Sequence, residues 1–156
     1  MFRTIIWATD GSEQAKEALP FAKALAEDDG RLVVVHSNEI FVGRGGGYPV
    51  LADETTLEEE IRHQVDELRS EGFDASFEFV TGSSTQAAHM IADVASKVDA
   101  DLIVVGTRGH GPVAGLIVGS VTQRLLHIAP CPVLAVPSAK QRAKRAAKRE
   151  HATVAS

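Results

Sequence analysis

Glycine is concentrated in residues 106–120, which read GTRGHGPVAGLIVGS. This stretch follows a short apolar run at residues 102–105, typical of a buried strand, and ends where a helical pattern begins. Glycines let the backbone approach an anion closely, and a helix N-terminus presents unpaired amides and about half a positive charge. No acidic residue lies between Asp101 and Glu150, so no carboxylate there repels a polyphosphate. The stretch therefore predicts a phosphate site.

Three phosphate-binding motifs can be told apart here. A Walker A loop needs Gly-Lys-Ser or Gly-Lys-Thr, whereas Gly111 is followed by Pro112. Residues 109–114 fit a loose dinucleotide fingerprint, but the acidic residue expected about 20 positions later is missing. The third pattern is glycine, two residues, glycine, nine residues, glycine and a hydroxyl residue. It is satisfied by Gly106, Gly109, Gly119 and Ser120.

The elements that would position this stretch alternate along the chain. Strands are predicted at residues 5–8, 32–36, 75–80, 102–105 and 133–136, and helices at residues 12–28, 54–71, 84–97 (from Ser83 or Ser84) and 120–128. This alternation favours an α/β fold with a parallel sheet, right-handed crossovers and helices on both faces. Ligands of such sheets bind beyond the carboxyl ends of the strands, where the winding reverses.

Several residues are expected to begin, bend or end these elements. Ser12 can cap the first helix, and Pro20 is expected to kink it. Thr56 and Glu59 resemble a capping box for the second helix, which should stop at Gly72.

Residues 37–53 show no packing pattern and include the glycine-rich run 43–47. We expect a flexible loop there, acting either as a lid over a bound ligand or as an idle connection. The strand at residues 75–80 has one polar face, so it should lie near a sheet edge.

These motifs together resemble the universal stress protein (UspA-like) family, and specifically its ATP-binding subgroup. The resemblance covers about residues 2–137 and includes ATDGS at residues 8–12, GSVT at residues 119–122 and PCPVL at residues 130–134. It implies an open five-stranded parallel sheet in the order 3-2-1-4-5, a Rossmann-like architecture also described as adenine nucleotide alpha hydrolase-like. It also implies a homodimer formed through the last strand.

The resemblance also implies which residues surround the nucleotide. Backbone near Ala8 and Asp10 would lie beside the nucleoside, and Ser37 would lie against adenine, at a position where the family commonly has an aliphatic residue. Asp10 either meets the ribose or a phosphate-bound Mg²⁺, or only caps the first helix. The implied contacts are Ala8, Asp10, Ser37, Gly106, Thr107, Arg108, Gly109, His110, Gly111, Pro112, Gly119, Ser120, Val121 and Thr122.

The leading hypothesis is an ATP-binding regulatory or stress-response protein that changes dimer packing or partners with nucleotide occupancy. No Glu, His or Lys has a spacing that identifies a general base, so we expect at most slow ATP hydrolysis and no catalytic residue. The alternatives are a cyclic AMP-binding member, an enzyme that activates a substrate with ATP, and a non-nucleotide interaction protein on the same scaffold.

Composition fits one domain at residues 1–138, followed by a basic tail at residues 139–156 with six Lys or Arg and one Glu. Such a tail could contact nucleic acid, an acidic membrane face or an acidic partner. We interpret it instead as a solvated appendage, flexible or helical, and do not expect nucleic-acid binding. No apolar run approaches the roughly 20 residues that span a bilayer, and no leader pattern opens the chain. With the single Cys131 read as a buried small residue, we expect a cytoplasmic protein.

Overall fold

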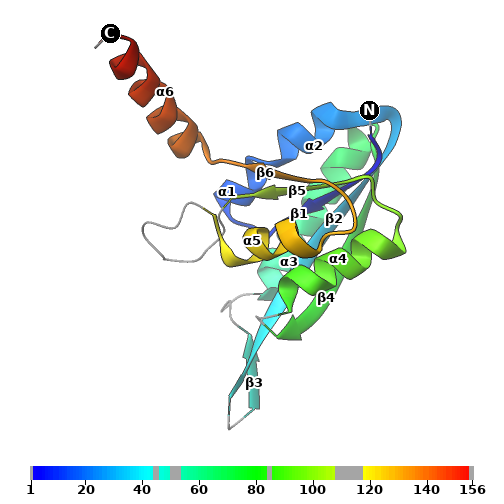
Figure 1. Ribbon diagram of the computed structural model, residues 1–156. Helices are drawn as coiled ribbons and strands as arrows, with labels where there is room; N and C mark the ends of the chain where they lie inside the picture. Colours follow the sequence, from blue (N-terminus) through cyan, green and yellow to red (C-terminus); the bar gives the residue numbers. More distant parts are fainter. Residues whose placement is uncertain (1, 44–45, 50–53, 84–85, 108–117, 155–156) are drawn as a thin grey trace.

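A five-stranded parallel sheet forms the centre of the computed structural model, which describes residues 2–43, 46–49, 54–83, 86–107 and 118–154 (Figure 1). Across the sheet the parallel strands lie in the order β4-β2-β1-β5-β6. Numbered along the chain, this is the order 3-2-1-4-5, so the predicted fold is confirmed. The strands are β1 (Phe2–Ala8), β2 (Ala26–Gly43), β4 (Asp74–Ser83), β5 (Leu102–Gly106) and β6 (Val133–Val136).

Helices cover both faces of this sheet, because alternate residues of each strand point to opposite sides. One apolar cluster joins one side of β1 to α2 and α3, and a second joins its other side to α4 and α5. Figure 1 shows these two layers on either side of the sheet. The helices are α1 (Glu13–Lys16), α2 (Leu19–Leu25), α3 (Glu54–Ser70), α4 (Ala87–Lys97), α5 (Ser120–Ile128) and α6 (Ala139–Val154).

The central strand β1 is fixed by a fully buried tryptophan. Trp7 has no exposed surface, and its indole nitrogen Nε1 donates a hydrogen bond to the carbonyl of Ala15, 3.1 Å away. This bond ties β1 to α1 immediately beside the turn that joins them. Trp7 therefore belongs to the core of the domain.

The first helix differs from the single helix predicted for residues 12–28. Ser12 caps α1 as expected, since its Oγ accepts from the amide of Ala15 at 3.1 Å. The helix then breaks, and Pro20 lies in the first turn of α2. A proline nitrogen carries no hydrogen, so it is tolerated in a first turn but not inside a helix. The predicted distortion is therefore a full break.

Strand β2 is much longer than predicted and overturns part of the loop expected at residues 37–53. It continues to Gly43 and forms an antiparallel hairpin with β3 (Gly46–Pro49). Residues 40–42 are Ile, Phe and Val, which favour strands, and β4 pairs with β2 as far as Ser83. Residues 44–45 and 50–53 lie outside the described part of the chain, so the lid stays a prediction.

The remaining boundaries lie close to the predictions. Helix α3 begins at Glu54, so the proposed capping box at Thr56 is wrong, but it ends as expected before Gly72, whose φ is 97°. Helix α4 begins at Ala87 rather than at residue 83 or 84, because β4 runs on to Ser83. Within the described residues β4 pairs only with β2, as expected of an edge strand. The predicted spans of α5 and β6 are confirmed.

Candidate functional site

The candidate site lies at the carboxyl ends of β1 and β5. Ala8 is paired in register with Val35 of β2 on one side and with Val105 of β5 on the other. The chain leaves β1 toward β2 but reaches β5 only after crossing to the opposite side of β1. Ala8 therefore ends at the point where the winding reverses, which is where open parallel sheets bind ligands.

The turn after β1 is held by its own side chains. Asp10 Oδ1 accepts hydrogen bonds from the amide of Ser12 at 3.0 Å and from its hydroxyl at 2.6 Å. The amide of Gly11 donates to Thr9 Oγ1 at 3.1 Å, and Gly11 has a φ of 76°. Ser12, rather than Asp10, caps α1. The Asp10 carboxylate is therefore held at the carboxyl end of β1 without being the cap of α1.

A buried histidine supports this turn from below. His36, only 1% exposed, places Nδ1 2.9 Å from the carbonyl oxygen of Thr9 and Nε2 against Glu54 Oε1. The ring of Phe79 lies 5.7 Å from the imidazole. No sequence pattern marks Glu54 as part of the site, because its partner is 18 positions away on another element. Their pairing fixes the carbonyl that immediately precedes Asp10.

The two ends of the glycine-rich stretch are hydrogen-bonded to each other. The amide of Gly119 donates to the carbonyl of Thr107 at 2.6 Å, and the amide of Thr107 donates to the carbonyl of Val136 at 2.9 Å. The stretch is thereby closed at its base, with the N-terminus of α5 at the closing point. The predicted contacts Arg108, Gly109, His110, Gly111 and Pro112 lie outside the described residues.

The first turn of α5 divides its hydroxyl groups between two tasks. Thr122 is buried and its Oγ1 donates to the carbonyl of Gly106 at 2.8 Å, which joins α5 to the end of β5. Ser120 is exposed, and Gly119, at the N-cap, has no side chain with which to cap the helix. Ser120 is thus the hydroxyl of this turn that solvent can reach, whereas that of Thr122 serves the fold.

Strand β2 contributes two polar groups beyond the end of β1. Ser37 Oγ and Asn38 Oδ1 are buried and have no hydrogen-bond partner within the part of the chain that the structure describes. Ser37 follows His36 directly and pairs with Val80 of β4. Burying a polar group without a partner costs about 1–3 kcal/mol. A ligand that reaches Ser37 would supply the missing hydrogen bond.

The described residues contain no cluster of three or more His, Cys, Asp or Glu that could hold a metal ion. Cys131 is half-buried and packs against the cluster under α4 and α5. Burial, and secondarily the charge of Asp101, raise the pKa of this thiol. Among the helices described, none has the length and apolar character needed to cross a membrane.

Comparison with known proteins agrees with this geometry. Residues 1–137 match the model of the universal stress protein family. A universal stress protein of Thermus aquaticus is 39% identical over 145 residues, covering 87% of this chain and 99% of the relative. A solved family member from Burkholderia pseudomallei is 30% identical with a TM-score of 0.62, covering 87% of this chain and 96% of its own.

A second solved structure is described as a universal stress protein in complex with cAMP. It is 25% identical to this chain with a TM-score of 0.59, and the match covers 86% of this chain and 96% of that one. The family match spans nearly the whole sheet and both of its helical layers. The chain therefore belongs to the universal stress protein family.

Proposed function

We propose that this protein binds an adenine nucleotide, with ATP as the first candidate, and acts as a cytoplasmic regulatory or stress-response protein. The observation that carries the proposal is the closure of the glycine-rich stretch by Gly119 and Thr107, with the start of α5 beside it. A helix N-terminus with unpaired amides next to a glycine-rich turn suits a phosphate chain. The related structure solved with cAMP supports an adenine nucleotide.

Different residues of the candidate site would contact different parts of the nucleotide. The amides of Ser120 and Val121 and the Ser120 hydroxyl would meet phosphates at the exposed start of α5. Asp10, held by Ser12, would meet the ribose or an Mg²⁺ ion carried by the phosphates. Ser37, whose hydroxyl lacks a partner among the described residues, would meet the base.

The site favours binding over turnover. Both ring nitrogens of His36 are engaged, one by the Thr9 carbonyl and one by Glu54, so this imidazole cannot accept a proton from an attacking water. Any hydrolysis by the described residues would depend on a positioned water alone, and we expect it to be slow.

Dimerisation through β6 forms part of the proposal. Among the described strands β6 pairs only with β5, and Val133, Leu134 and Ala135 are partly exposed along it. Helix α5 begins at the proposed phosphate site and is followed along the chain by β6. A bound nucleotide could therefore affect the dimer interface at β6 through this one helix. Light scattering with and without ATP tests this; a monomer at every protein concentration would contradict it.

The decisive test of binding uses the exposed Ser120. Calorimetric titration with ATP and Mg²⁺ should show saturable binding to the nucleotide-stripped protein, with little ADP released. Ser120→Asp places a negative charge where a helix N-terminus welcomes it, so the fold should keep or gain stability. The same charge repels a phosphate, and we expect at least a tenfold loss of ATP affinity. The neutral control Ser120→Ala should lose much less ATP affinity. Equal ATP affinities in the parent, Ser120→Asp and Ser120→Ala would show that the phosphates do not bind at the start of α5.

Cyclic AMP is the second candidate, because a solved relative is described in complex with it. Titration with cyclic AMP and GTP beside ATP separates the alternatives. Tighter binding of cyclic AMP than of ATP would replace our first candidate. If ATP, cyclic AMP and GTP all fail to bind, the alternative of a non-nucleotide interaction protein on the same scaffold is favoured.

A further inference from the structure

Helix α6 begins beyond the segment that the family model matches. That match ends at residue 137, and α6 begins at Ala139. Residues 139–156 contain six Lys or Arg and one Glu, whereas residues 1–138 contain ten Lys or Arg and 20 Asp or Glu. An acidic body thus carries a basic helix, hereafter the arm (Ala139–Val154).

The first turn of the arm is fixed to the body by several contacts. Gln141 Oε1 accepts hydrogen bonds from Thr107 Oγ1 and from the amide of Ser138, both at 2.9 Å. The Arg142 guanidinium lies 5.7 Å from the centre of the Phe21 ring and 3.7 Å from the Glu17 carboxylate. These contacts set the direction in which the arm leaves the sheet, and Figure 1 shows it projecting away from the body.

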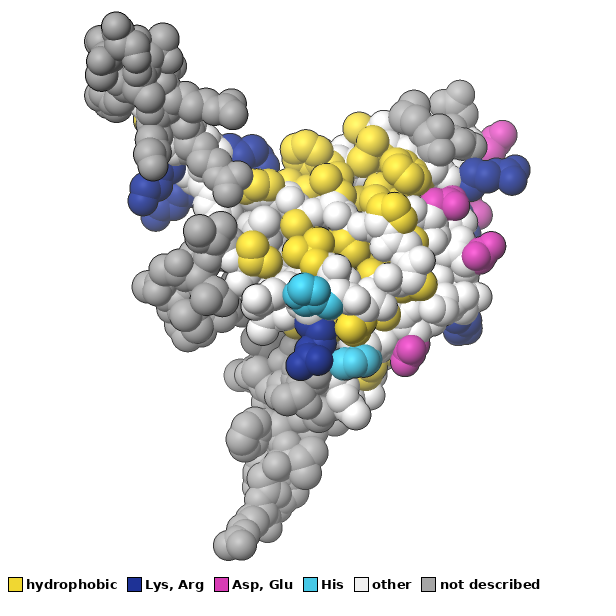
Figure 2. All heavy atoms as spheres, in the orientation of Figure 1, with side chains coloured by type: hydrophobic (Ala, Val, Ile, Leu, Met, Phe, Trp, Pro, Cys, Tyr) yellow, Lys and Arg dark blue, Asp and Glu magenta, His cyan; other side chains and the backbone are white. Residues whose placement is uncertain are grey.

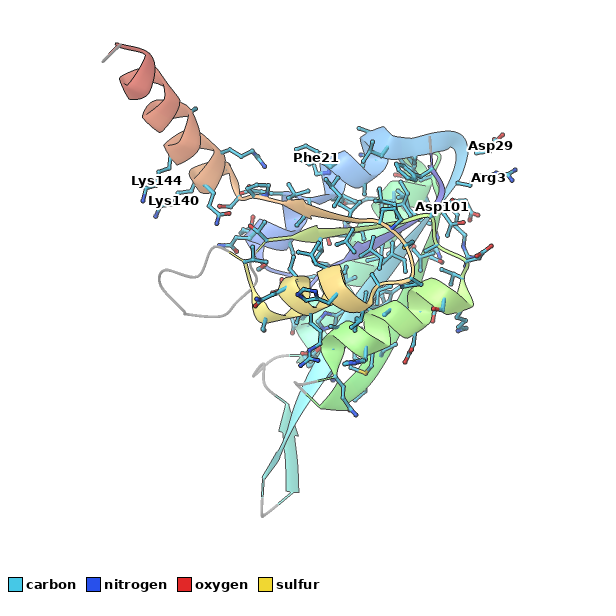
Figure 3. The ribbon with its side chains drawn as sticks, viewed as in Figure 1. Arg3, Phe21, Asp29, Asp101, Lys140 and Lys144 are labelled. Carbon is cyan, nitrogen blue, oxygen red and sulfur yellow. The ribbon has the colours of Figure 1, made fainter. Side chains whose placement is uncertain are left out.

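Two lysines near the start of the arm are accessible to solvent. Lys140 and Lys144 are exposed and extend from the first turns of the arm in Figure 3. On the face shown in Figure 2, acidic side chains gather on the side of the body opposite the arm. A helix of 16 residues is about 24 Å long, well over the Debye length of about 8 Å at physiological salt. The body's negative charge is therefore largely screened along the outer arm.

The composition of the arm decides what kind of partner it suits. Its apolar residues are alanines and Val154, with no Leu, Ile, Phe or Trp. Helices that lie in a membrane surface need such large apolar residues, and protein interfaces need buried aromatic or aliphatic anchors. A nucleic-acid backbone needs only accessible cations. We propose that the arm binds the phosphate backbone of nucleic acid without sequence preference, in place of the solvated appendage that the sequence suggested.

Fluorescence anisotropy of the full chain with a labelled 20-base single strand and a 20-base-pair duplex tests the proposal. Each neutralised phosphate contributes about 0.7–0.9 to the slope of log affinity against log salt. Four contacts would lower the affinity roughly 50- to 150-fold between 50 and 200 mM salt. Flat salt dependence, or no binding at 25 mM salt, would overturn the proposal.

A matched pair of triple variants separates the arm from overall charge. Lys144→Gln, Lys148→Gln and Arg149→Gln together leave the root contacts of Gln141 and Arg142 intact, and should reduce the slope by about 2–3. The control removes three cations at the surface of the body, which form ion pairs with acidic side chains, and should bind as the parent does. Its changes are Lys16→Gln, Arg62→Gln and Lys97→Gln.

Equal binding by the two triple variants would show that only net charge matters and would overturn the proposal. The proposal also fails if the parent binds vesicles containing 30% phosphatidylserine more tightly than either oligonucleotide. The test is independent of the nucleotide site, because no ATP or cyclic AMP is added and both triple variants leave the residues of that site unchanged.

Discussion

The pair formed by Glu54 and His36 should be required for the stability of the domain. His36 is 1% exposed, and its Nδ1 faces the carbonyl of Thr9, a group that only accepts hydrogen bonds. Nδ1 must therefore carry a hydrogen. The other ring nitrogen, Nε2, is hydrogen-bonded to Glu54 Oε1. Glu54→Ala removes this partner and leaves a buried ring nitrogen unsatisfied.

The expected magnitude follows from the burial and position of the pair. An unsatisfied buried polar group costs about 1–3 kcal/mol. Loss of an acidic residue from the first turn of α3 adds about 0.3–1 kcal/mol. We therefore expect Glu54→Ala to lower the free energy of unfolding by about 1–4 kcal/mol, and Tm by roughly 3–16 °C for a chain of this length.

Denaturant unfolding at pH 7 measures the effect against two controls. Glu54→Gln keeps an amide that can either donate to Nε2 or accept from it, so it should lose less than Glu54→Ala. Glu58 lies one turn further along α3 and pairs with the exposed Arg62, so Glu58→Ala should cost about 0.5 kcal/mol or less. A loss for Glu54→Ala no larger than that for Glu58→Ala would refute the reasoning.

Two further predictions concern the turn after β1 and the single cysteine. Gly11→Ala should destabilise the domain by more than Gly72→Ala in thermal melts: both positions have positive φ, but a Cβ at Gly11 would lie 2.0 Å from Leu57 Cδ1, whereas nothing lies within 4 Å at Gly72. Equal Tm losses would show that Leu57 moves aside freely. Burial and the Asp101 charge raise the pKa of Cys131, so its thiolate is scarce at neutral pH. At pH 8, iodoacetamide should alkylate Cys131 more slowly than it alkylates the free thiol of glutathione. The alkylation rate of Cys131 should still rise with pH above pH 9, and a rate that levels off below pH 8.5 would contradict the prediction.

Local patterns were sufficient to predict the parts of the site that are themselves local. The apolar run ending at Ala8, the cap Ser12 and the helix start at Ser120 each depend on a few neighbouring residues, and the structure has them as predicted. Strand order was predicted through the family resemblance alone, and the structure has the same order. These features arise from backbone preferences that short stretches of sequence express directly.

Contacts between distant elements could not be predicted in the same way. Glu54 reaches His36 across 18 positions, and Gln141 reaches Thr107 across 34. Neither glutamate nor glutamine carries a pattern that marks its partner. The extension of β2 to Gly43 likewise depends on pairing with β4 and β3, because strand formation reflects neighbouring strands more than intrinsic preference.

Thr107 lies between the two proposed sites, the phosphate site at the start of α5 and the arm. Its carbonyl closes the glycine-rich stretch by accepting from Gly119, and its hydroxyl donates to Gln141 at the root of the arm. Its amide is bonded to Val136 at the end of β6. A single residue thus fixes the proposed phosphate end, the edge strand and the exit of the arm. The start of α5 and the root of the arm are therefore held by the same short backbone segment.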